Sequence, residues 1–104
     1  MRTWKRGFIE IVGEILESLS KKPLKKSHIS YQCNLDARAV TKYLNFMLQL
    51  KIVEKSKYLN CYQITTKGIK FLEQYITLTK FLQKDLKIEH KIKKSYIYKP
   101  QINI

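Results

Sequence analysis

The spacing of hydrophobic and polar positions along the chain predicts four helices and one β-hairpin. Between Trp4 and Leu19 the hydrophobic residues recur at helical spacing, which indicates one buried stripe of a first helix. The stripe would consist of Phe8, Ile11, Val12, Ile15, Leu16 and Leu19. Glu10, Glu14 and Glu17 fall on the opposite side of this helix, so we expect that acidic surface to point away from any anionic ligand.

The next segment, SKKPLKK, is expected to be a loop, because Pro23 does not fit inside a helix and the lysines favour water. Ser27 is expected to cap a short helix, HISYQC, that ends in a tight turn at residues 34–35. Asp36 would cap the following helix, since its carboxylate can accept free backbone N–H groups and suits the positive end of the helix dipole. Two helices joined by so short a turn favour a helix-turn-helix.

After Leu50 the hydrophobic residues no longer follow helical spacing. The stretch IVEKSKYLNCYQIT has β-branched and aromatic residues on both sides of a polar tip, Lys55 to Asn60, which is typical of a two-stranded hairpin with a loose loop. Thr65 or Thr66 would cap a last helix that extends to about residue 92.

The last helix is hydrophobic over a wider arc than one packing stripe needs. Part of it follows the 3, 4, 3, 4 spacing of a coiled-coil seam, so we expect self-association; the alternative is a helix that folds back on its own domain. The seam would consist of Leu72, Tyr75, Thr79, Leu82 and Leu86. The expected organisation is a winged domain over residues 1–72, a dimerisation coiled coil over 73–92 and a basic tail over 93–104, either a short strand or a flexible arm.

The helix that Asp36 opens has a polar side without a carboxylate. This arc consists of Arg38, Thr41, Lys42, Asn45 and Gln49. A solvated helix usually mixes glutamate with lysine, whereas every residue here can donate a hydrogen bond. Arginine suits guanine, asparagine or glutamine suits adenine, and lysine or threonine suits phosphate. The arc therefore predicts a surface that contacts DNA; the alternative is a wet helix that lacks acids by chance.

Composition supports an anionic partner. The formal net charge is +13, from 21 Lys+Arg against 8 Asp+Glu, which favours a nucleic acid, although a lysine- and isoleucine-rich composition also arises in AT-rich genomes. Between Ser18 and Val53 the only acid is Asp36. Further backbone contacts are expected beside the short helix and on the hairpin tip, from Lys25, Lys26, Ser27, His28, Tyr31, Lys55, Lys57 and Tyr58.

Other classes of protein are disfavoured. No hydrophobic run approaches the length of a membrane-spanning helix, so a cytoplasmic, nucleoid-associated protein is expected. Cys33 and Cys61 lack zinc-ligand spacing and are expected to be small buried residues, with a disulfide as the alternative. No metal, no cofactor and no catalytic grouping is expected, hence no enzyme.

Several short motifs resemble a known family. SHISYQCNLDARAVTKYLNFML and YQITTKGIKFLEQY are similar to the small archaeal winged-helix chromatin proteins of the "ten-a" type, over about residues 5 to 86. The matching elements are Ile29, Tyr31, Asn34, Leu35, Tyr43, Leu44, Thr65 or Thr66, Lys67, Gly68, Phe71 and Leu72. The resemblance implies a homodimer joined by an antiparallel coiled coil, with two winged domains that bind duplex DNA, often with limited sequence preference. Lys51 stands where the family usually has glycine, which implies a different end to the preceding helix.

The expected fold is therefore mainly α with a small β-hairpin: a winged helix-turn-helix with a long C-terminal dimerisation helix. The expected function is that of a homodimeric double-stranded DNA-binding protein, either an architectural chromatin protein or a transcription regulator. A protein-interaction module and an RNA-binding protein are the alternatives.

Overall fold

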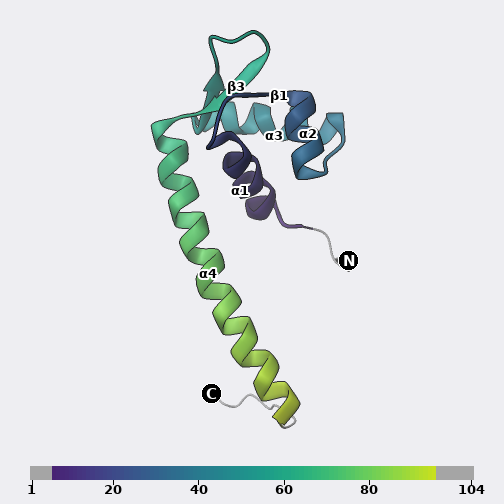
Figure 1. The fold of residues 1–104 in the computed structure, drawn as a ribbon, viewed down its shortest axis with the longest axis vertical. Coiled ribbons are helices and arrows are strands. Elements are labelled where there is room, and N and C mark those ends of the chain that lie inside the picture. The colour runs from purple at the N-terminus through teal and green to yellow at the C-terminus, as the bar shows by residue number, and fades with distance from the viewer. Residues whose placement is uncertain (1–5, 96–104) are drawn as a thin grey trace. The chain divides into compact units, whose positions relative to one another are not determined.

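The computed structural model describes the backbone of residues 6–95 and the side chains of residues 6–81. In chain order its elements are α1 (Phe8–Leu19), β1 (Leu24–Lys25), α2 (Lys26–Cys33), α3 (Ala37–Gln49), β2 (Val53–Lys55), β3 (Cys61–Ile64) and α4 (Thr66–Ser95) (Figure 1). A helix, a helix-turn-helix, a β-hairpin and a further helix in this order define a winged helix. The chain divides into two compact units, Met1–Gln74, called the winged domain below, and Tyr75–Ile104.

α1 begins at Phe8, the first residue of the predicted hydrophobic stripe, and ends at Leu19, its last. Gly7 precedes the helix in an extended conformation, and its N–H donates a 3.0 Å hydrogen bond to Glu10 Oε1. That carboxylate satisfies one backbone N–H at the helix start, where no carbonyl is available to do so. One of the three predicted surface acids therefore has a structural role.

α2 begins one residue before the predicted cap. Lys25 occupies the N-cap position with an extended backbone, and it makes no side-chain cap hydrogen bond, so the expectation that Ser27 caps this helix is wrong. The cause is the strand β1, in which Leu24 pairs with Tyr62 and Lys25 with Cys61. The strand holds Lys25 extended directly at the point where the helix starts.

The turn between α2 and α3 agrees with the prediction. Asn34 adopts the left-handed conformation, with φ 55°, and the Leu35 N–H donates a 3.0 Å hydrogen bond to the Ser30 carbonyl. Asparagine tolerates this conformation better than most residues. Asp36 then caps α3, because its Oδ1 accepts a 2.7 Å hydrogen bond from the Ala39 N–H.

The sheet is antiparallel with the order β1-β3-β2. β2 and β3 form the predicted hairpin, here called the wing together with their loop, and Glu54 lies opposite Gln63 in the register. A third strand, β1, was not predicted, because the segment that contains it was expected to be a loop. Its two residues carry no period of their own, and they pair with a strand far along the chain.

Hydrophobic side chains from every element of the winged domain form its core. They are Ile11, Val12, Ile15, Leu16, Leu19, Leu24, Ile29, Cys33, Val40, Leu44, Met47, Ile52, Val53, Tyr62 and Leu72. Complete burial of a residue such as Ile15 or Leu44 contributes about 1.5–3 kcal/mol relative to exposure. The core thereby fixes which side of α3 faces outward.

Candidate nucleic-acid interface

The predicted polar arc of α3, called the α3 arc below, lies on the surface. The opposite side of the helix is buried in the core through Val40, Leu44 and Met47. Arg38, Lys42, Asn45 and Gln49 are exposed, whereas Thr41 is half-buried. The Thr41 hydroxyl accepts a 3.3 Å hydrogen bond from Lys26 Nζ. Thr41 therefore marks the edge of the arc that faces α2, and the other members form its open part.

Basic and polar side chains at the start of α2 extend this surface. Lys25, Lys26, Ser27 and His28 are exposed, and Tyr31 is 88% exposed. The contact between Lys26 and Thr41 joins them directly to the α3 arc.

A cleft of about 700 Å³ separates the start of α2 from the wing. It is lined by Lys25, Lys26, Ser27, Lys55, Ser56, Lys57, Tyr58, Leu59, Asn60, Cys61 and Tyr62. Four of these residues are lysines and none is acidic, so the cleft is strongly cationic. It is called the lysine cleft below. The sequence predicted its lysines as separate contacts, but the cleft exists only because β1 pairs with β3.

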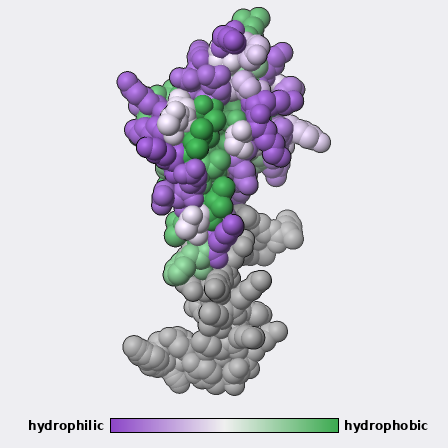
Figure 2. Space-filling view, turned by 60° about the vertical axis from the view of Figure 1, so that its left-hand side comes forward, coloured by the Kyte–Doolittle hydropathy of each residue, from purple (hydrophilic) through white to green (hydrophobic). Residues whose placement is uncertain are grey.

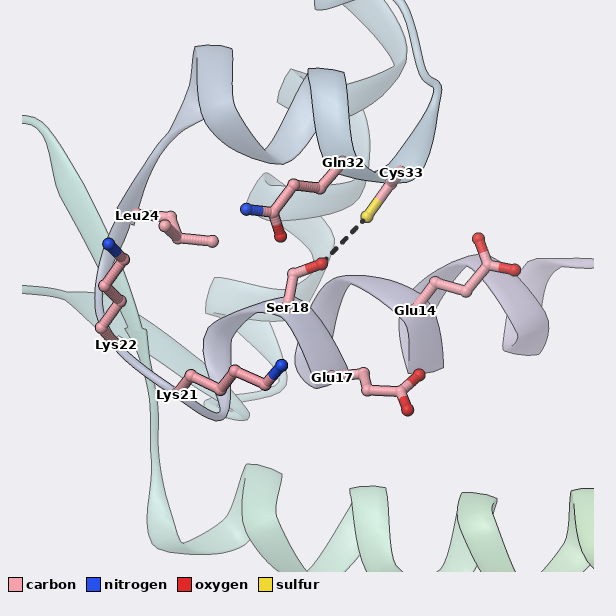
Figure 3. Close-up of a pocket in the computed structure, with 8 residues that line it drawn as sticks. All are labelled: Glu14, Glu17, Ser18, Lys21, Lys22, Leu24, Gln32 and Cys33. Carbon is pink, nitrogen blue, oxygen red and sulfur yellow. Dashed lines mark hydrogen bonds between the residues drawn. The ribbon is translucent and has the colours of Figure 1, made fainter.

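A second cleft lies between α1 and α2 (Figure 3) and has a different character. Glu14 and Glu17 line it together with Lys21 and Lys22, so its charge is mixed and does not favour a polyanion. Within it the Cys33 thiol and the Ser18 hydroxyl form a 3.5 Å hydrogen bond.

Cys33 is buried, as predicted, and its burial raises the pKa of the thiol. Cys61 is half-buried. Both thiols are free, so the structure contains no disulfide between them. Among the side chains of residues 6–81, no cluster of three or more His, Cys, Asp or Glu residues is arranged to hold a metal ion. No described helix combines the length and the hydrophobicity needed to cross a membrane.

Arg6 holds the helix-turn-helix against α1, a role that sequence analysis missed. Its guanidinium forms an ion pair with the Glu14 carboxylate and donates to the carbonyls of Cys33, at 2.6 Å, and Asn34, at 3.0 Å. These carbonyls belong to the turn that precedes α3. Because Arg6 precedes the helix and its cap, it lies outside the helical period, and no pattern in the sequence predicted its contacts.

The turn that ends α3 differs from the one that the sequence predicted. Lys51 adopts the left-handed conformation, with φ 63°, in the place where the related family usually has glycine. The Lys51 N–H donates to the Leu48 carbonyl at 3.0 Å, and the Ile52 N–H to the Met47 carbonyl at 3.1 Å. This is the hydrogen-bond pattern of a Schellman motif. The expectation of a different helix end is wrong, because lysine adopts the conformation that glycine favours.

The start of α4 binds the end of α3. The Thr65 hydroxyl donates to the Lys51 carbonyl at 2.7 Å and accepts from the Gly68 N–H at 3.0 Å, so Thr65, rather than Thr66, caps α4. Lys67 Nζ donates to the Leu50 carbonyl at 2.9 Å. The Thr-x-Lys-Gly motif therefore satisfies carbonyls at the end of α3 and sets the position of α4 against it.

The predicted dimerisation residues differ in how far their side chains are buried. Leu72 is 7% exposed within the winged domain, and Tyr75 and Thr79 are half-buried. The side chains of Leu82 and Leu86 lie outside the described residues.

Other hydrophobic side chains remain on the surface. Figure 2 shows a band of hydrophobic side chains with hydrophilic ones on either side of it. On the winged domain, Phe8 is 45% exposed although it stacks on Tyr43, with ring centroids 5.5 Å apart, and meets Phe46 edge-on at 4.8 Å. On α4, Leu78 and Phe81 are 48% and 59% exposed.

Comparison with known sequences places the chain among archaeal relatives. The sequence profile of the winged helix-turn-helix family matches residues 5–83. An uncharacterized protein of Methanocaldococcus jannaschii is 36% identical over 70 residues, which cover 67% of this chain and 32% of that protein. A second uncharacterized protein of that organism is 34% identical over 56 residues, covering 54% of this chain and 58% of that protein. The chain thus spans about a third of the length of the first relative.

Comparison with solved structures shows the same fold. Sso10a-2, a DNA-binding protein from Sulfolobus solfataricus, matches with a TM-score of 0.78 at 18% identity, covering 90% of this chain and 100% of that chain. ZitR of Lactococcus lactis, a zinc-responsive MarR family member, matches with a TM-score of 0.62 at 18% identity, covering 91% of this chain and 66% of that chain. ZitR in complex with DNA matches with a TM-score of 0.60 at 18% identity, covering 88% of this chain and 67% of that chain. The archaeal winged-helix resemblance inferred from the motifs is confirmed. The chain belongs to the winged helix-turn-helix family.

Proposed function

We propose that the protein binds double-stranded DNA as a homodimer, and acts as an architectural chromatin protein or as a transcription regulator at the nucleoid. The observation that carries the proposal is the position of the acid-free α3 arc beside the lysine cleft, joined by the contact of Lys26 with Thr41. An α-helix fits the major groove, and cationic side chains on either side of it meet the phosphates. Sso10a-2 is described as a DNA-binding protein, and ZitR has a structure with DNA, which supports this assignment.

Within this proposal the parts of the surface have different roles. Arg38, Asn45 and Gln49 contact base edges from α3, whereas Thr41 and Lys42 hold the adjacent phosphates. The backbone contacts continue from the start of α2 onto the wing. They come from Lys25, Lys26, Ser27, His28, Tyr31, Lys55 and Lys57.

A fluorescence anisotropy titration with a labelled duplex tests the α3 arc. The triple variant Arg38→Ala, Lys42→Ala, Asn45→Ala removes two positive charges and one amide from the arc. The control Lys70→Ala, Lys80→Ala removes the same charge from exposed positions on α4. We expect the triple variant to lose at least about tenfold in affinity and the control to lose much less, because each bidentate base contact contributes about 1–3 kcal/mol. Equal losses of affinity in the triple variant and the control would show that the arc contributes only non-specific charge attraction.

The same titration separates the proposed partner from the alternatives. A duplex RNA of the same length has a deep and narrow major groove that an α-helix does not enter, so we expect weaker binding to it. Tighter binding to RNA would favour the RNA-binding alternative. No measurable affinity for either duplex would favour a protein-interaction module.

The choice between a regulator and an architectural protein depends on specificity. A regulator should prefer a selected site over random DNA by about 10³ or more, whereas an architectural protein should show little preference and a steep dependence on salt. Competition between random and selected duplexes at two salt concentrations measures both quantities.

The homodimer is proposed to form through α4, with residues 73–92 as its coiled coil and residues 93–104 as a basic tail. The exposure of Leu78 and Phe81 supports a further contact for this helix, since two large hydrophobic side chains on it remain in water. Light scattering of Leu82→Asp, Leu86→Asp should show a monomer. The matched variant Gln83→Asp, Lys87→Asp, which lies outside the 3, 4, 3, 4 spacing, should remain a dimer. A dimer in both would remove the proposed seam.

A further inference from the structure

The loop of the wing presents hydrophobic side chains to solvent. Leu59 is 81% exposed and Tyr58 is 58% exposed. Of the large hydrophobic side chains that the structure describes, only Tyr31, at 88%, is more exposed than Leu59. In Figure 1 the loop between β2 and β3 projects beyond the rest of the winged domain. The most prominent part of this domain therefore ends in an aliphatic residue that does not pack on the core.

Hydrogen bonds define the conformation of this loop. The Ser56 N–H donates to the Cys61 carbonyl at 2.9 Å, and the Cys61 N–H donates to the Tyr58 carbonyl at 3.1 Å. The Tyr58 N–H donates to the Ser56 hydroxyl at 3.0 Å. Asn60 completes the turn in the left-handed conformation, with φ 60°. Leu59 is thus held at the end of a closed turn, so little conformational entropy is lost when it enters a binding site.

The charges around Leu59 are positive. Lys57 Nζ lies 5.9 Å from the centre of the Tyr58 ring, and Lys55 Nζ lies 6.0 Å from that of Tyr62. The other wall of the lysine cleft carries Lys25 and Lys26.

The one carboxylate of the wing lies away from these lysines. Glu54 accepts a 2.6 Å hydrogen bond from the Gln63 side chain, opposite it in the register. Because successive side chains of a strand point to opposite faces, this pair is on the face of the hairpin away from Lys55. Two hydrophobic side chains, Leu59 and Tyr58, within a group of cations make too small a patch to match a protein surface, which would need a larger hydrophobic area.

Such a pattern matches the minor groove of duplex DNA. Its phosphates are anionic, and its floor opens to an aliphatic side chain where two base pairs unstack. The lysine cleft adjoins the α3 arc through the contact of Lys26 with Thr41, so both surfaces can meet one duplex.

We propose that Leu59 is a wedge that enters the minor groove next to the site of α3 and partly unstacks one base step, so that the protein bends the DNA it binds. Lys55 and Lys57 hold the phosphates on the two sides of the widened groove, and Tyr58 packs against the sugars. The inference rests on the proposed DNA binding but adds an activity to it. Binding by α3 requires no bend, whereas a wedge produces one.

Two fluorescence measurements on the full-length protein test the wedge. Energy transfer between dyes at the two ends of a duplex of about 30 base pairs reports the bend, and 2-aminopurine at a central TA step reports unstacking. We expect both signals to rise when the wild-type protein binds. Leu59→Ala should abolish them while the duplex stays bound, and Leu59→Phe should keep them, because phenylalanine also serves as a wedge.

An exposed aliphatic residue outside the wing and outside the proposed dimer contact provides the control. Ile9→Ala shortens a side chain on α1 that is 48% exposed, and it should leave both signals unchanged. Affinity gives an independent readout. Wild type should bind a duplex with a central two-adenine bulge about tenfold more tightly than the paired duplex, since the bulge is already unstacked, and Leu59→Ala should lose this preference.

The outcomes are distinct. If wild type binds DNA without a change in either signal, or if Leu59→Ala bends DNA as wild type does, the wedge is refuted while the DNA-binding proposal stands. If no duplex is bound at all, the DNA-binding proposal fails first and the wedge fails with it. Co-sedimentation with vesicles of phosphatidylcholine and phosphatidylglycerol provides a further arm: a loss of vesicle binding in Leu59→Ala, with DNA bending unchanged, would overturn the proposal in favour of a membrane surface.

Discussion

Gly68 in α4 approaches the carbonyl oxygen of Ile52 so closely that a Cβ atom added at residue 68 would lie 2.1 Å from that oxygen. The same atom would lie 2.8 Å from Cγ1 of Ile64. Ile52 follows Lys51 in the turn after α3, and the Thr65 N–H donates a 3.1 Å hydrogen bond to the Ile52 carbonyl. The glycine of the Thr-x-Lys-Gly motif is therefore required by the distance between α4 and the chain that leaves α3.

We expect Gly68→Ala to lower the free energy of unfolding by about 1–3 kcal/mol or more, because the atom it meets is backbone and cannot rotate away. Gly7→Ala is the matched control, since a Cβ there meets nothing within 4 Å. Urea denaturation of both variants measures the difference. A loss in Gly68→Ala no larger than that in Gly7→Ala would show that α4 moves freely relative to Ile52.

The left-handed conformation of Lys51 makes the opposite change favourable. We expect Lys51→Gly to raise the free energy of unfolding by about 0.5–1 kcal/mol, since the strain of a side chain in this conformation exceeds the entropy lost by glycine. Lys51→Ala removes the same charge but keeps the Cβ, and it should leave stability near the wild-type value. Thermal denaturation of the two variants isolates the backbone contribution, and equal melting temperatures would contradict it.

Arg6 should contribute more to stability than its ion pair alone. Its side chain is 19% exposed and also binds two backbone carbonyls, so Arg6→Ala leaves the carboxylate and both carbonyls without their donor. We expect a loss of about 2–3 kcal/mol for Arg6→Ala and about 1 kcal/mol for Glu14→Gln. Chemical denaturation measures both. Equal losses would mean that the carbonyl contacts contribute nothing.

The Cys33 thiol gives the winged domain a dependence on alkaline pH. Because its pKa is raised in the folded protein, the unfolded chain ionises first as pH rises past the ordinary value of 9.0. The unfolded chain then binds fewer protons than the folded one, so the free energy of unfolding falls as pH rises. Cys33→Val, which keeps the volume but has no thiol, should lose less stability than wild type between pH 8 and 10, roughly the range around a thiol pKa. Parallel denaturation curves at the two pH values measure this, and identical losses would contradict it.

The lysine cleft should account for much of the salt dependence of DNA binding. Each lysine–phosphate contact adds about 0.9 to the slope of log affinity against log salt. We therefore expect Lys26→Ala, Lys57→Ala to lower that slope by about 2, whereas Asn45→Ala should weaken binding with the slope unchanged. Titrations at several salt concentrations measure the slopes. An unchanged slope in the double variant would show that these two lysines do not contact the phosphates.

Most of the helical part of the fold was predictable because its information is local. The cap at Asp36, the turn at Asn34 and the buried side of α3 follow from residue types and helical period, and the structure agrees with each of them. The buried stripe of α1 also follows from the helical period, whereas the cap of this helix depends on the extended backbone at Gly7.

The candidate site was only partly predictable, since its two halves depend on different distances in sequence. The α3 arc lies on one helix, so a helical wheel was sufficient. The lysine cleft depends on the pairing of Lys25 with Cys61, and no local pattern in a two-residue strand shows it. The contacts of Arg6 join residues far apart in the chain for the same reason.

The double role of Lys25 has a consequence for how the protein meets a duplex. The same residue ends β1, which pairs with the wing, and forms the N-cap of α2. Both walls of the lysine cleft are thus joined by backbone at a single residue, and the wing cannot swing away from α2 unless that pairing breaks. The backbone pairing thus limits how far the cleft can open, so a duplex bound as proposed would have to adapt its own shape to it.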